Sequence, residues 1–107
     1  MDIQLNEQFQ NGDFVKSTLD QIEKDFRLCG LDFCFSNREV NQDNYLIELS
    51  TELQKLSGEQ LFQFLYILDI TPQKLMETTD GNDFLWMAKL VVERAAKKVY
   101  LRRFYSS

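Results

Sequence analysis

Residues 83–105 read DFLWMAKLVVERAAKKVYLRRFY and contain neither glycine nor proline. Apolar side chains recur along this stretch at the three- and four-residue spacing of one helix face, at Leu85, Ala88, Val92, Ala95 and Val99. Asp83 stands where a capping residue is expected. At 1.5 Å per residue the helix would be roughly 34 Å long, against a radius of gyration of about 13 Å for a domain of this size. The stretch therefore predicts a long C-terminal helix that traverses the whole domain.

Two upstream segments carry the same helical spacing. In residues 13–29 the apolar positions recur every three or four residues, and Gly30 follows as a helix-terminating glycine. In residues 44–56 leucines repeat at the same spacing, and Asp43 or Asn44 is suited to cap the first turn. Both segments are therefore predicted to be amphipathic helices.

The next segment is predicted to form the centre of the fold. Ser57 and Gln60 match the capping-box pattern at the start of a helix. The helix that follows, through Ile70, is apolar on nearly all sides, and a helix of that kind is expected to be surrounded by other elements. Thr71 and Pro72 then signal the start of a short helix over residues 72–78.

Residues 31–36 alternate between apolar and polar side chains, as a β-strand does. No partner strand is evident, and a lone strand would leave backbone groups without hydrogen-bond partners. These residues are therefore predicted to be an extended linker laid onto the core, and residues 1–12 a loosely ordered arm. The chain is expected to form one all-α domain over residues 1–107, a compact bundle of four or five helices with a long C-terminal helix.

Charge is divided unevenly along the chain. Residues 1–83 carry 16 acidic and 6 basic side chains, whereas residues 84–107 carry 1 acidic and 6 basic side chains. Cations at i,i+4 spacing form a stripe along one side of the last helix, and aromatic residues follow at its end. The candidate partner-binding residues are Arg94, Lys97, Lys98, Arg102, Arg103 and Tyr105.

Three interpretations of this basic stripe remain open. The cations can complement the helix dipole and pair with acidic side chains of the same chain. They can form a protein interface, either in a homodimer or with an acidic partner. They can also contact the phosphates of a nucleic acid or an anionic membrane, although the net charge of −5 and the isoelectric point of about 4.6 disfavour that interpretation.

The sequence offers little catalytic or ligand chemistry. It has no histidine, the usual general base and a common metal ligand. Cys29 and Cys34 lack the C-x-x-C spacing, and no glycine-rich phosphate loop is present. We therefore expect no enzyme activity, no cofactor and no metal site. A small-ligand site lined by Phe62, Tyr66 and Trp86, near one of the cysteines, would require a concave pocket.

No segment reads as a targeting signal or a membrane span. The first residues lack a basic region followed by an apolar one, and no run of about 18 apolar residues occurs. We therefore expect a soluble cytoplasmic protein without a membrane partner.

Two segments carry a resemblance to known proteins. Residues 64–75 read FLYILDITPQKL, and residues 88–102 read AKLVVERAAKKVYLR. Together they are similar to small uncharacterised bacterial all-α proteins. The resemblance implies a bacterial cytoplasmic helical protein and brings no activity with it.

The aromatic content favours association. The nine phenylalanines, four tyrosines and one tryptophan, together with the leucine-rich stripes, exceed what a few short helices are expected to bury. Interfaces are enriched in aromatic residues and arginine, both of which the last helix carries. The sequence therefore predicts a non-enzymatic protein-interaction or regulatory module that can self-associate. The alternative is nucleic-acid binding through the basic C-terminal helix.

Overall fold

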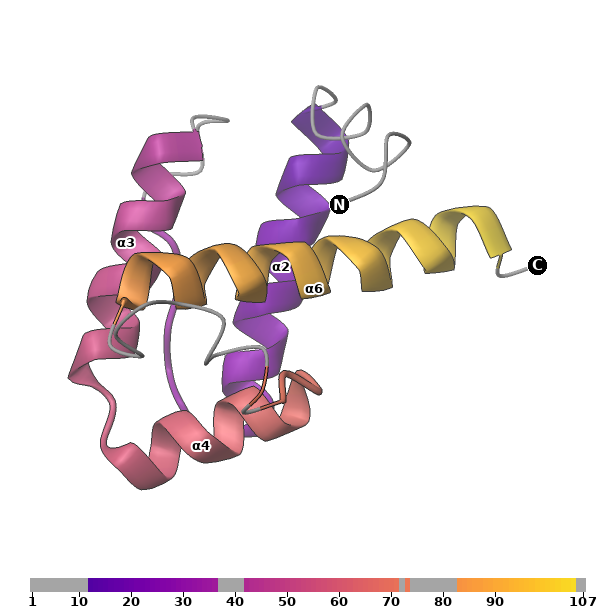
Figure 1. The fold of residues 1–107 in the computed structure, drawn as a ribbon. Coiled ribbons are helices and arrows are strands. Elements are labelled where there is room, and N and C mark those ends of the chain that lie inside the picture. The colour runs from indigo at the N-terminus through magenta and orange to yellow at the C-terminus, as the bar shows by residue number, and fades with distance from the viewer. Residues whose placement is uncertain (1–11, 37–41, 72, 74–82, 106–107) are drawn as a thin grey trace.

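The C-terminal helix α6 (Phe84–Tyr105) crosses the other two long helices, α2 (Gly12–Leu28) and α3 (Gln42–Lys55), and packs against both (Figure 1). The fourth helix, α4 (Gly58–Ile67), lies near the end of α2. The computed structural model describes residues 12–36, 42–71, 73 and 83–105. Within these ranges all regular secondary structure is helical, which confirms the predicted all-α class and the long terminal helix.

Small side chains let α6 approach its neighbours closely. Ala88, Val91, Ala95 and Ala96 are fully buried, and Val99 is nearly so. Because none of these side chains is long, the axis of α6 can lie close to the helices that it crosses. At about 25 cal/mol per Å² of apolar surface removed from water, such continuous burial is a leading source of stability.

An aromatic cluster joins the lower part of the fold. Phe26 of α2 stacks on Phe64 of α4 with 4.1 Å between ring centroids, and it contacts Phe33 at 4.8 Å. Phe35 meets Phe33 edge to face at 4.9 Å. Offset and edge-to-face contacts of this kind add to the burial energy, so the cluster fixes the linker and α4 to α2.

Three helix boundaries follow the local signals in the sequence, whereas α3 begins at Gln42, ahead of Asp43 and Asn44, which were predicted to cap it. Gly30 has φ +74°, and the N–H of Leu31 donates to the carbonyl of Phe26 at 3.0 Å, which closes the end of α2 as predicted. The capping box at α4 is also confirmed, since the N–H of Gln60 donates to Ser57 Oγ and the N–H of Ser57 donates to Gln60 Oε1. Asp83 caps α6 by accepting from the N–H of Trp86 at 3.1 Å.

The prediction that the helix after Ser57 forms the surrounded centre of the fold is wrong. Phe64 and Leu65 are buried, but Phe62 is 68% exposed and Tyr66 is 76% exposed. The helix also ends at Ile67 rather than near residue 70. At the periphery of the bundle a ten-residue helix has neighbours on one side only, so its apolar composition does not ensure burial.

The chain leaves α4 through a turn that uses a non-glycine residue in the left-handed region. Asp69 has φ +60°, and the N–H groups of Asp69 and Ile70 donate to the carbonyls of Tyr66 and Leu65, each at 3.0 Å. This is the Schellman arrangement, with aspartate in the place that glycine usually takes.

The helix expected over residues 72–78 lies almost entirely outside the described residues, as does the expected arm apart from Gly12, which begins α2.

Residues 31–36 form the predicted linker between α2 and α3. Phe33 and Phe35 are buried, whereas the alternate residues Asp32, Cys34 and Ser36 are exposed. The linker is held from both sides by glutamates of the flanking helices. Glu23 of α2 accepts the N–H of Phe35 at 2.8 Å, and Glu48 of α3 accepts the N–H of Ser36 at 2.7 Å.

Candidate functional site

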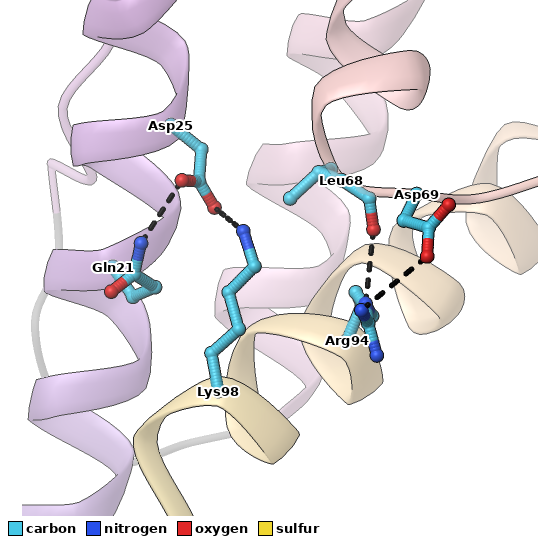
Figure 2. Close-up of polar contacts among 6 residues, drawn as sticks. All are labelled: Gln21, Asp25, Leu68, Asp69, Arg94 and Lys98. Atoms are coloured by element: carbon cyan, nitrogen blue, oxygen red, sulfur yellow. Dashed lines mark hydrogen bonds and ion pairs between the residues drawn. The ribbon is translucent and has the colours of Figure 1, made fainter. Parts of the chain in front are cut away.

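The predicted basic stripe lies on the second half of α6. Figure 2 shows two of its cations, Arg94 and Lys98, each turned toward a different neighbouring element. The stripe therefore does not present all of its charge to one side of the molecule. The contacts of each cation determine how much of the stripe remains open to a partner.

Lys98 pairs with a buried carboxylate. Its Nζ lies 3.5 Å from Oδ2 of Asp25, whose side chain is 1% exposed, and Gln21 Nε2 donates to the other oxygen of Asp25 at 2.9 Å (Figure 2). A carboxylate so removed from water requires such partners. Lys98 therefore helps to fasten α6 to α2.

Arg94 completes the C-terminal end of α4. Its Nε–H donates to the carbonyl oxygen of Leu68 at 3.0 Å, and its Nη2 lies 3.6 Å from Oδ2 of Asp69 (Figure 2). The last carbonyls of a helix have no partner within the helix and carry partial negative charge. Arg94 satisfies one of them and is placed beside the left-handed Asp69 turn.

Two more cations of α6 contact the same chain. Lys97 forms the expected i,i+4 pair with Glu93 at 3.3 Å. The Nη2 of Arg103 donates to Ser17 Oγ at 2.7 Å and to the carbonyl of Asp13 at 3.3 Å. The ion pairs of Arg94, Lys97 and Lys98 are the contacts that the first interpretation of the stripe describes, whereas these two hydrogen bonds of Arg103 are to a hydroxyl and a backbone carbonyl.

Arg102 belongs to a cationic cluster that the sequence pattern did not reveal. Together with Lys24 and Arg27 of α2 it lines a shallow hollow of about 270 Å³, with Ser17 and Asp20 also on its wall. Lys24 and Arg27 are exposed, as is Arg102. Their i,i+3 spacing on α2 was visible, but their approach to Arg102 depends on how α2 and α6 cross.

The end of α6 carries exposed apolar side chains. Leu101 is 52% exposed and Phe104 is 53% exposed, and they share one helix face at i,i+3 spacing. Tyr100 supports Phe104 with 4.6 Å between ring centroids. Figure 1 shows this end reaching past α2. Tyr105 is the last residue of α6, and its side chain lies outside the description. We call residues 100–104 the α6 end.

The structure gives little support to a small-ligand site lined by Phe62, Tyr66 and Trp86. Phe62 and Tyr66 face outward on α4, whereas Trp86 packs partly buried against the core from α6. Burial, and secondarily the carboxylate of Asp25, raises the pKa of the Cys29 thiol, which lowers the thiolate fraction that a nucleophile needs. No cluster of three potential metal ligands occurs in the described ranges.

Comparisons with known proteins give no match, whether with protein-family models, curated sequences or solved structures. None of the helices in the described part of the chain has both the length and the apolar character needed to cross a membrane.

The two lysines of the stripe are expected to differ in their effect on stability. Lys98→Met should lower the free energy of unfolding by about 1–3 kcal/mol, because it removes a cationic partner from the buried Asp25. Lys97→Met, the matched control, removes a partly exposed i,i+4 pair with Glu93 in which neither side chain is buried, and should change stability by about 0.5 kcal/mol or less. Urea unfolding of both variants measures the difference, and equal losses would contradict the fastening role of Lys98.

Proposed function

We propose that the chain is a non-enzymatic interaction module that self-associates through the α6 end. The observation that carries the proposal is the exposure of Leu101 and Phe104 on one face of a helix that extends past the packed body. Contiguous exposed apolar side chains with polar neighbours are characteristic of protein interfaces. Such side chains lose contact with water when a second copy covers them.

The charges around the α6 end support a protein partner. Arg102 and Arg103 adjoin the apolar pair, and arginine with aromatic residues is the composition of energetic hot spots. The rest of the chain is acidic, so a second copy offers carboxylates near this basic end of α6. We propose a bacterial cytoplasmic setting on the resemblance of residues 64–75 and 88–102.

Nucleic-acid binding is the second candidate, and the cluster of Lys24, Arg27 and Arg102 favours it because three cations from two helices line one hollow. The ion pairs of Arg94, Lys97 and Lys98 count against it, since cations already paired within the chain gain less from phosphate contacts. We therefore rank it below self-association.

Self-association predicts a dimer in solution. Light scattering behind a sizing column at about 50 µM, a concentration that reveals micromolar dissociation constants, should give a mass above that of the monomer. The double change Leu101→Ser with Phe104→Ser should return the mass to that of the monomer without loss of helix signal, because both side chains are already exposed. Leu85→Ser is the control, since Leu85 is an exposed leucine near the other end of α6. A strictly monomeric wild type, or a double variant that remains dimeric, would reject the proposal.

The second candidate makes a different prediction. Binding of a labelled single-stranded DNA should weaken with salt along a logarithmic slope of about −2, as expected for three phosphate contacts. Lys24→Glu should abolish that binding, whereas Leu101→Ser should not. Fluorescence anisotropy measures both, and absence of binding at low salt would reject nucleic-acid recognition.

A further inference from the structure

A second surface, remote from the α6 end, lies between the linker and α3. It is a groove of about 620 Å³ with the linker on one wall and the exposed face of α3 on the other. Its volume lies within the range of ligand-binding clefts. The linker contributes Asp32, Cys34 and Ser36 to the lining, and α3 contributes residues from Asn44 to Lys55. We call it the linker groove.

The linker presents a backbone edge to this groove. In an extended segment the N–H and C=O of one residue point to the same edge, and those of the next residue point to the opposite edge. Phe35 donates its N–H to Glu23 of α2, and Ser36 donates its N–H to Glu48 of α3. Cys34 and Asp32 lie two and four residues before Ser36, so their backbone groups point to the same edge as those of Ser36. That edge faces α3 and the groove.

These backbone groups are available for pairing. Asp32 and Cys34 make no backbone hydrogen bond to any residue in the described part of the chain. A row of unpaired N–H and C=O groups on an extended segment is a template for another extended chain. Many recognition domains bind peptides in this way, with main-chain bonds for affinity and side-chain contacts for selectivity.

The walls of the groove define the chemistry of the occupant. Ile47 of α3 lines it and is 60% exposed, so it offers an apolar contact. Asp32, Glu48 and Glu52 contribute three carboxylates against the one cation of Lys55. The complementary ligand is therefore a chain segment that carries both apolar and basic side chains.

The length of the groove also fits such a segment. Asn44 and Lys55 are separated by about 17 Å along α3 at 1.5 Å per residue. An extended peptide rises about 3.4 Å per residue, so about five residues span that distance. Within this length Glu48 accepts hydrogen bonds from the N–H and the Oγ of Ser36.

We propose that the linker groove binds an extended, basic peptide segment of another protein, which pairs as a strand with the backbone of Asp32 and Cys34. The α6 end takes no part in this binding, so the groove and the proposed self-association are independent. The apolar side chains of the segment contact Ile47, and its basic side chains face the three carboxylates. The bound segment supplies backbone partners that Asp32 and Cys34 do not have within the described residues.

The probe is the peptide acetyl-Lys-Val-Lys-Val-Lys-Val-amide, added to the full ¹⁵N-labelled chain. At a free concentration ten times the dissociation constant, the amide hydrogens of Asp32 and Cys34 should exchange about tenfold more slowly. Ile47→Ser should weaken binding about tenfold through the lost apolar contact. Leu28→Ser, which alters an exposed leucine outside the groove lining, is the matched control and should leave binding unchanged.

Two further peptides distinguish strand pairing from charge attraction. Glutamate in place of each lysine should weaken binding at least tenfold, and N-methylation of alternate backbone amides, which keeps the charge, should do the same. Equal binding of the methylated peptide, unchanged exchange at Asp32 and Cys34, or absence of binding would overturn the proposal. Slow exchange of both amides that appears without peptide as the protein concentration rises would also overturn it, because a second copy would then occupy the groove.

Discussion

The structure depends on the burial of a small-residue face of α6 across both α2 and α3. Ala88, Val91, Ala95 and Ala96 are fully buried, and the two long helices are each packed against α6. A larger side chain at one of these alanines would force the helices apart, and tightly packed interiors tolerate such overpacking poorly. The linker lies between α2 and α3 and is bonded to each of them by a glutamate, so its position follows from the same crossing.

The crossing of α6 over its neighbours also determines which partners the basic residues of α6 contact. Where α6 passes α2, Lys98 meets the buried Asp25, and where it passes the end of α4, Arg94 meets the carbonyl of Leu68. A cationic stripe that looks like a single binding surface in the sequence is thus divided among separate elements. Beyond the crossing, α6 retains the apolar pair Leu101 and Phe104 at the surface. The proposed interaction surface is therefore centred on the two apolar side chains that the helix crossing leaves exposed.

Local signals in the sequence account for most of the fold. The spacing of apolar residues located the four described helices, and capping residues such as Ser57 and Asp83 marked their starts. These features are determined by neighbours within one turn, which a sequence displays directly. The long terminal helix was predicted for the same reason, whereas the linker was predicted because no partner strand was evident for its alternating pattern.

The features that were missed depend on which elements meet. The apolar composition of α4 indicated full burial, yet its place at the periphery leaves Phe62 and Tyr66 exposed. The pair of Asp25 and Lys98 joins residues 73 positions apart, and nothing in either local sequence marks it. The linker groove was also missed, because its walls are two segments whose alignment is created by packing on the rest of the bundle.

Native-state hydrogen exchange along α6, at a concentration where light scattering shows a monomer, tests the central role of the helix crossing most directly. The amides from Val91 to Val99 should open only with the whole molecule, with a free energy equal to that of global unfolding, whereas those from Leu101 to Phe104 should exchange through local fraying. A uniform protection along α6, or opening of residues 91–99 well below the global free energy of unfolding, would contradict the account.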